Sequence, residues 1–290
     1  MNLARGPLHA MAAIAVLSLG LTGCAGSDST TAGATGAPAA SGSVAGGAAA
    51  ADGARADLAA AAAELQKGNF VFTATGHEEK TTGTMHLPSR SASLVVTSPD
   101  KEDGDSRMEV RLVDEKQYRL LLVKTPKEDR VDLADLPPDF RSVYEALSGK
   151  FWMRVDTTKI KPDSRSRGMR LDQPDISGAS AMLSTVVTAQ RTGDVIKGTV
   201  DLSAVPLHNT PWLQSDITAM GSAARTVPFE ATLDGRRRLT RLAVDLPATT
   251  DAPAHRRVVE LKDYGAAKPT TKPQGEIRDA PEKTYDLLNR

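Results

Sequence analysis

The sequence predicts an α+β fold in which a curved, half-open antiparallel β-sheet of about ten strands wraps around three or four helices. Segments in which apolar and polar residues alternate follow one another along the chain, which is typical of consecutive antiparallel strands. A few segments with helical spacing of apolar residues stand before and between these runs. An open sheet of this size twists and curls, so we expect the helices to cover its concave face.

The first 23 residues have the pattern of a bacterial lipoprotein signal peptide. Arg5 supplies the positive charge, and residues 11–21 form an apolar stretch that is too short to span a bilayer core of about 30 Å. The stretch ends in Leu21-Thr22-Gly23-Cys24, which has the pattern of a lipobox. We therefore expect cleavage between Gly23 and Cys24, followed by attachment of lipid, for instance palmitate, to Cys24.

Cys24 is the only cysteine in the protein. An unpaired thiol in an exported protein is otherwise a liability, which favours lipidation over the alternative, an ordinary signal peptide with an incidental cysteine. Each buried CH₂ of an acyl chain contributes about 0.8 kcal/mol, so a multiply acylated cysteine anchors a protein stably. The expected location is the extracytoplasmic face of the cell membrane, with the protein lipid-anchored.

The rest of the chain divides into three regions by composition. Residues 24–53 consist almost entirely of Gly, Ala, Ser and Thr, so we predict a flexible linker with a reach of about 30 Å. Residues 54–265 contain the alternating segments and are predicted to form the folded domain, followed by a polar surface tail over residues 266–290. Lys+Arg and Asp+Glu balance at 36 each, so nothing favours a nucleic-acid partner.

The predicted domain begins with a helix over residues 54–67, which has Leu58, Ala62 and Leu65 on one stripe and Gly68 at its end. The hydrophobic period then changes from 3.6 to 2. Strands are expected over residues 70–75, 82–87, 92–97, 108–112, 118–122, 151–156, 194–202, 227–233, 239–246 and 256–262.

One hairpin has the clearest alternation, with a three-residue turn expected at Asp114-Glu115-Lys116. Its two strands are predicted to turn one shared set of residues inward: Met108, Val110, Leu112, Tyr118, Leu120 and Leu122.

Later helices are expected over residues 139–148, 177–191 and 210–224. The second has Met182, Leu183, Val186 and Val187 on its apolar face, and the third begins with Thr210 as N-cap and Pro211 in its first turn. Residues 161–175 are predicted to form a charged loop that contains Arg165, Arg167 and Arg170.

Catalytic motifs are scarce. The sequence contains no nucleophile elbow, phosphate-binding loop or dinucleotide fingerprint. His77-Glu78 begins like a zinc-protease motif, but Thr81 stands where the second ligand is needed, so we interpret this segment as a solvated turn. Ser98-Pro99-Asp100-Lys101 has the spacing of a serine–lysine pair, but the proline and the predicted hairpin end oppose the required helical geometry. We predict a protein that is not an enzyme and has no cofactor.

Two charged runs are interpreted as solvated turns. Asp100, Glu102, Asp103 and Asp105 offer the oxygens that calcium prefers, but they lack EF-hand spacing, and no metal site is predicted. Arg236-Arg237-Arg238 follows the predicted turn at Asp234 as a hairpin tip, with contact to anionic lipid headgroups as the alternative.

A cavity results if the helices do not fill the concave face, and an apolar cavity is the usual form of a lipid site. The same side chains would otherwise form an ordinary filled core. The candidate lining residues are Phe70, Phe72, Met108, Val110, Leu112, Leu120, Leu122, Phe151, Met182, Val186, Trp212 and Met220.

Three segments carry a resemblance to a known family. Residues 150–156, Lys-Phe-Trp-Met-Arg-Val-Asp, look like the K-W-x-R-V-D strand of actinobacterial lipoproteins of the LppX/LprG type, within the wider LolA/LolB-like fold. Residues 227–242 look like the closing hairpin of that family, and Leu261-Lys262-Asp263-Tyr264-Gly265 resembles the end of its domain. The resemblance covers roughly residues 55–265 and implies a half-open sheet whose cavity, in some members, carries acylated lipids or glycolipids.

The predicted function follows from the lipobox, the predicted architecture and the family resemblance. We expect a monomeric, membrane-anchored lipoprotein that binds or carries a lipid, glycolipid or other apolar ligand. The alternative is a non-enzymatic protein-interaction module at the cell envelope, with a filled core and an envelope protein as partner. A hydrolase would need a polar cleft with coupled titratable groups, and the sequence offers no such set. The helix over residues 139–148 and the basic loop over residues 161–170 are departures from the family that can reshape the mouth of the cavity.

Overall fold

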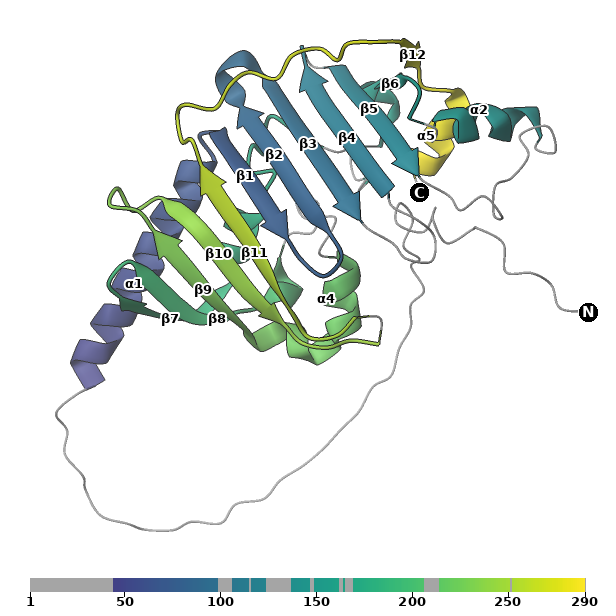
Figure 1. The fold of residues 1–290 in the computed structure, drawn as a ribbon. Coiled ribbons are helices and arrows are strands. Elements are labelled where there is room, and N and C mark those ends of the chain that lie inside the picture. Colours follow the sequence, from purple (N-terminus) through teal and green to yellow (C-terminus); the bar gives the residue numbers. More distant parts are fainter. Residues whose placement is uncertain are drawn as a thin grey trace, which may run out of the picture.

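The computed structural model describes residues 44–98, 106–114, 116–123, 137–146, 149–161, 164, 169–205, 214–250 and 252–289. These residues form an α+β fold built on one large open sheet of twelve strands in the order β12-β6-β5-β4-β3-β2-β1-β11-β10-β9-β8-β7. All neighbouring strands are antiparallel except β12 and β6, so the sheet is mixed. The sheet curves, and the helices lie toward one of its faces (Figure 1).

The strands are β1 (Asn69–Thr75), β2 (Lys80–His86), β3 (Ser91–Ser98), β4 (Ser106–Val113), β5 (Lys116–Val123), β6 (Trp152–Val155), β7 (Val186–Thr192), β8 (Val195–Val200), β9 (Val227–Leu233), β10 (Leu239–Leu246), β11 (His255–Lys262) and β12 (Ile277–Asp279). The α-helices are α1 (Val44–Leu65), α2 (Pro138–Ala146), α3 (Ala179–Leu183), α4 (Gln214–Met220) and α5 (Glu282–Leu288). Each of the ten strands predicted from the hydrophobic alternation is present, and the bounds of β9 and β10 agree with the prediction. The two strands that were not predicted, β7 and β12, are the two edges of the sheet.

The helix predicted over residues 177–191 is wrong in its second half. Only Ala179–Leu183 is helical, and Val186–Thr192 forms the edge strand β7, which pairs with β8. Val186, Val187 and Thr188 are β-branched residues, whose stiff side chains favour strands. Gly193 adopts a left-handed φ of 61° and closes the tight turn into β8.

The predicted inner face of the β4–β5 hairpin is wrong for β5. Val113 pairs with Lys116, so the turn contains two residues rather than the three that we predicted. This shift of one residue reverses which face each side chain of β5 occupies. Leu120 therefore lies opposite Glu109 on the outer face, and Arg119 lies opposite Val110 on the inner face.

Helix α1 begins at Val44, within the region predicted as linker, and continues to Leu65. Alanine has the highest helix propensity of all residues, so an alanine-rich segment continues a helix that is held at one end by packing. The packed face is formed by Ala54, Leu58, Ala61 and Leu65, each at most 1% exposed. The structured part of the chain thus starts ten residues before the predicted domain boundary at 54.

The C-terminal region is largely exposed over residues 266–276, as expected for a surface tail, but it also forms β12 and α5, which we did not predict. Residues 266–276, here called the strap, run across the ends of the strands from β11 to β12 (Figure 1). In the strap, the backbone N–H of Ala267 donates to Asn69 Oδ1 at 3.1 Å, and that of Thr270 donates to Ser91 Oγ at 2.9 Å. Arg154 then holds the Asp279 carboxylate through two hydrogen bonds of 2.7 and 2.9 Å. Polar composition suggested exposure, but backbone groups and short side chains provide the attachment.

The remaining helices agree with their predictions in place and differ at their ends. Helix α2 ends at Ala146, and α4 continues as a 3₁₀ helix over Gly221–Thr226. The start that we predicted for the α4 helix, at Thr210, lies outside the described residues. Within the described part of the chain, no helix combines the length and the apolar character needed to cross a membrane.

Candidate functional site

The inner face of the sheet carries the candidate lining residues of β1 and β4. Its largest side chains are Phe70 and Phe72 of β1, both fully buried. Across the ladder, Phe72 lies opposite Gly83, and Gly83 lies opposite Leu94. A Cβ on Gly83 would stand 2.2 Å from the ring of Phe72, so the ring occupies the space that a side chain at position 83 would need.

A large apolar cluster covers this face from β7 to β4. Helices α1 and α3 pack together over it, and α1 contacts β7 and β10. Eight of the twelve predicted lining residues belong here, six of them buried and two, Met108 and Val186, partly buried against it. The six are Phe70, Phe72, Val110, Leu112, Met182 and Met220.

A second apolar cluster lies at the β6 end, and the sequence did not predict it as a separate unit. Met153 and Val155 of β6 meet Tyr285 and Leu288 of α5, and Ala146 of α2 joins them. Phe151, a predicted lining residue, belongs to this cluster. The hydroxyl of Tyr285 accepts a hydrogen bond of 2.9 Å from the backbone N–H of Asp156, which fixes the ring beside β6.

A polar column on β5, formed by Gln117 and Arg119, separates the two clusters. Arg119 lies between Val110 of β4 and Met153 of β6 in the ladder. Its Nε donates to Gln117 Oε1 at 2.7 Å, and Gln117 is fully buried. Burial lowers the pKa of the Arg119 guanidinium to about 10, against a smaller raising effect of Tyr285. A guanidinium with this pKa is still charged at neutral pH.

Sequence reasoning missed this column for a specific reason. The alternation in β5 gave the same weight to Leu120 and Leu122 as to the apolar residues of β4, and the assumed turn length put them on the inner face. Leu120 is half-buried on the outer face, and Leu122 pairs with Arg107 across the ladder. The signal that could have located Arg119 was Asp114, because aspartate tolerates the left-handed conformation that a two-residue hairpin turn requires. In the structure Asp114 adopts this conformation, with a φ of 50°.

Four predicted site residues or segments lie outside the described residues: Gly23 and Cys24, Trp212, and the segment from Pro99 to Asp105. The side chain of Leu122 is also outside the described part. The lipid-attachment prediction at Cys24 therefore stays a prediction.

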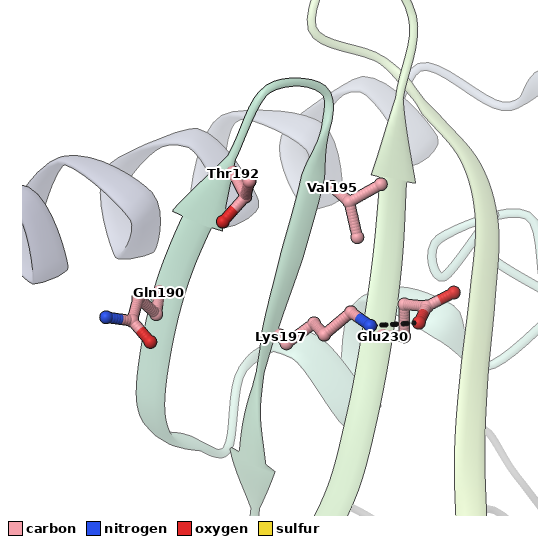
Figure 2. A pocket seen from close by; sticks show the side chains of 5 residues that line it. All are labelled: Gln190, Thr192, Val195, Lys197 and Glu230. Atoms are coloured by element: carbon pink, nitrogen blue, oxygen red, sulfur yellow. Dashed lines mark ion pairs between the residues drawn. The ribbon is translucent and has the colours of Figure 1, made fainter.

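A depression of about 440 Å³ lies on the outer face, away from both clusters. Figure 2 shows its lining, which comes from β7, β8 and β9, with Lys197 directed at Glu230. The ion pair spans 3.0 Å, and Arg241 and Arg256 also approach Glu230, at 3.3 and 3.7 Å. The hydrogen bond from Lys197 is the main cause of the lowered pKa of Glu230. A lining that contains an ion pair and the polar side chains of Gln190 and Thr192 does not suit an acyl chain.

The arginine run lies at the tip of the β9–β10 hairpin, and Arg236 and Arg237 are exposed there as predicted. The run is nevertheless tied to the domain by side-chain contacts, which the sequence did not predict. Arg237 donates to the buried carboxylate of Asp57 on α1 at 2.5 Å. Arg238 donates to Asp234 at 2.8 Å and lies 4.9 Å over the ring of Tyr264. These contacts hold α1 and the segment after β11 against the sheet.

His77 lies in the turn between β1 and β2, as the sequence predicts, with its ring 3.7 Å from Glu78 and 5.6 Å from the ring of His255. Among the described residues, no group of three His, Cys, Asp or Glu side chains is arranged to hold a metal ion. In the described part of the charged loop predicted over residues 161–175, Arg170 donates a hydrogen bond to Asp172 at 2.9 Å.

Comparison with known proteins adds no family to this geometry: the chain matches no model of a known protein family and no curated protein sequence.

Proposed function

We propose that the protein is a membrane-anchored extracytoplasmic lipoprotein that binds a lipid or another apolar ligand between its sheet and its helices. The observation that carries the proposal is the break in the inner face at β5. Large apolar clusters stand on both sides of it, and Val96 and Met108 beside it are only partly buried. Partly exposed apolar side chains at the margin of a packed cluster offer a surface to which an apolar ligand can bind. We also propose that the protein has the LolA/LolB-like fold and is of the LppX/LprG type, as the sequence resemblance implies.

The anchor is proposed from the leader alone. The lipobox at Leu21-Thr22-Gly23-Cys24 and the absence of any other cysteine in the sequence support it. The chain between Cys24 and the start of α1 at Val44 then leaves the domain free to approach both the membrane and the cell wall.

The test is extraction of the full-length protein under non-denaturing conditions, followed by mass spectrometry of the intact complex and of its organic extract. We expect a co-purified lipid in addition to the covalent acyl chains. Phe72→Ala, which deletes a large side chain of the packed cluster, serves as a folding-sensitive control, and Arg107→Ala on the outer face serves as a neutral one. Recovery of the protein without any bound lipid from several expression hosts would count against the proposal.

One observation favours the second candidate, an envelope protein-interaction module. Phe70, Phe72 and Met182 are at most 1% exposed, so the larger cluster is filled at these positions. This candidate predicts that cross-linking in intact cells yields one reproducible protein partner and that no lipid accompanies the purified protein.

A further inference from the structure

One end of the sheet carries exposed cations that form no ion pair within the described part of the chain. On the outer face, by contrast, Lys197 and Arg256 both approach the carboxylate of Glu230. The exposed cations, here called the basic row, come from the β9–β10 turn, the end of β11 and the strap: Arg236, Lys262, Lys268 and Lys272.

The sheet topology brings these residues to the same end. Arg241 near the start of β10 pairs with Glu260 near the end of β11, and Lys262 pairs with Val71 near the start of β1. The strap leaves β11 at this end and crosses the ends of the next strands (Figure 1). Neighbouring strands lie about 4.8 Å apart, so the five steps from β10 to β4 give a row about 24 Å long.

The strap holds its two lysines in place from the backbone. Lys268 lies between two attachment points, the backbone N–H groups of Ala267 and Thr270. Lys272 is followed by Pro273, which is buried and has a fixed φ. Contact with a partner through these lysines therefore needs little further ordering of the backbone.

Acidic side chains weaken one part of the basic row. Glu260 and Asp263 flank Lys262 in the sequence and are exposed, so they offset its charge. Asp114 and Asp194 lie in the turns at the two limits of the row. The excess of positive charge is therefore centred on the strap lysines and the β9–β10 turn.

This charge is one-sided, because Lys+Arg and Asp+Glu of the whole chain balance at 36 each. A neutral protein with one basic face is attracted and oriented by an anionic surface. The row is long and follows the end of a sheet rather than lining a pocket, which suits a flat surface with many anions better than a single small anion.

The proposed anchor permits the basic row to face the bilayer. Helix α1 has 22 residues and is about 33 Å long, and it leads into β1 at the end of the sheet that carries the row. The 20 positions from Cys24 to Val44 span at most about 70 Å when fully extended. The chain can therefore pass alongside α1 and still reach the membrane.

We propose that the basic row docks the folded domain on the anionic headgroups of the membrane that holds the lipid anchor. This inference rests on the proposed function, because it uses the anchor at Cys24. A basic side chain near an anionic bilayer contributes about fivefold to the binding constant, and salt screens the contribution. In the docked state the strap lies between the domain and the headgroups.

The first test is acetylation footprinting of the full-length lipoprotein on vesicles of phosphatidylcholine with or without phosphatidylglycerol, read by mass spectrometry of its peptides. The three lysines of the row should react at least about fivefold more slowly on the anionic vesicles. Lys80, at the opposite end of the sheet, should react equally on both. Salt at about 1 M, where the Debye length is about 3 Å, should remove the difference.

Matched double variants separate the position of the charge from its amount. Lys268→Gln/Lys272→Gln should abolish the protection of Lys262, since the loss of two cations weakens binding about twentyfold. Lys80→Gln/Lys161→Gln removes the same charge from exposed positions outside the row and should leave Lys262 protected. Thermal unfolding of both variants checks that they are folded.

The outcomes distinguish this inference from the proposed function. Equal acetylation of an acylated wild type on both kinds of vesicle, or equal loss of protection in the two double variants, overturns the role of the basic row and leaves the anchor intact. Protection in intact cells without protection on the vesicles also overturns it, because the row then faces a wall polymer or a protein.

A purified chain without an acyl group would contradict the anchor of the proposed function. Flotation of that chain with the same vesicles then decides the present inference separately. Flotation with the anionic vesicles alone supports the basic row as a membrane-docking surface, and failure to float with them overturns it.

Discussion

At the scale of single residues, the carboxylate of Asp57 links elements that are far apart in the sequence. Helix α1 carries it, and it forms ion pairs with Arg191 of β7 and with Arg237 of the β9–β10 hairpin. Its side chain is 9% exposed, so both arginines meet a carboxylate that is largely removed from water. Asp57 is separated from its two partners by more than 130 residues in the sequence, so no local sequence pattern could predict these ion pairs.

We expect Asp57→Asn to lower the free energy of unfolding by about 1–3 kcal/mol, because it leaves two arginines without their shared anion. Urea denaturation monitored by circular dichroism measures the change. Asp52→Asn is the control, since Asp52 is 77% exposed and its ion pair with Arg55 spans 3.7 Å. Its effect should stay within about 0.5 kcal/mol. Equal effects of the two variants would refute the structural role of Asp57.

A second prediction at this scale concerns Gly83. Gly83→Ala should destabilise the protein by about 1–3 kcal/mol, because the new Cβ meets the ring of Phe72, which is fully buried and has no room to move. The control is Gly235→Ala, where nothing lies within 4 Å of the added Cβ. Differential scanning calorimetry compares the melting temperatures of the two variants. A melting temperature for Gly83→Ala equal to that of the control would contradict the packing described for β1 and β2.

At the scale of elements, the C-terminal segment closes one end of the sheet. Strand β12 pairs in parallel with β6, and α5 packs Tyr285 and Leu288 into the second cluster. Asn289 accepts from the backbone N–H of Lys161 at 2.7 Å and donates to the carbonyl of Lys159 at 2.9 Å. The segment therefore pairs with β6, packs against it and binds the turn that follows it.

We expect a chain that ends at Glu276 to lose the order of β6 before that of the rest. Amide hydrogen exchange over residues 151–161 should rise strongly, because the edge of β6 and the apolar side chains beneath α5 become accessible to water. Exchange in β9 and β10, at the other end of the sheet, should change little. Lys283→Ala, at an exposed position of α5, is the control and should leave exchange in β6 as in the wild type. An unchanged exchange rate in β6 after truncation would refute this role.

Elements were predictable where their cause is local. Strands β9 and β10 alternate cleanly and are joined by a turn around Asp234, whose carboxylate accepts from the backbone N–H groups of Arg236 and Arg238 at 2.9 Å. Strand β7 was not predictable by the same means, because its apolar residues also satisfy helical spacing. Only its pairing with β8 decided between the two.

At the scale of the whole molecule, the sheet joins two unequal apolar clusters. The leader that we propose for residues 1–23 would determine where the molecule works. The domain reaches from Val44 to Asn289, so its beginning lies 20 positions after Cys24. The strap runs from β11, an interior strand of the sheet, to β12 at one edge (Figure 1).

We expect Cys24→Ala to abolish acylation, since cysteine supplies the only thiol in the chain. The variant should retain its leader or leave the membrane fraction, whereas the wild type should stay there through a high-salt wash. Metabolic labelling with a palmitate analogue and immunoblotting of cell fractions measure both properties. Ser27→Ala, three positions later, is the control and should behave as the wild type. Labelled, membrane-bound Cys24→Ala protein would contradict the lipobox interpretation.

By itself the sequence determined the α+β class, ten of the twelve strands and most of the large inner-face side chains, because hydrophobic periodicity is imprinted on each strand locally. The tertiary structure alone decided which face β5 turns inward, since a turn shorter by one residue reverses every side chain of the strand. It also decided the fate of the C-terminal region, whose partners lie more than 120 residues away. Arg119 depends on both: its charge stands in the sequence, and its place among apolar side chains follows only from the register of the sheet.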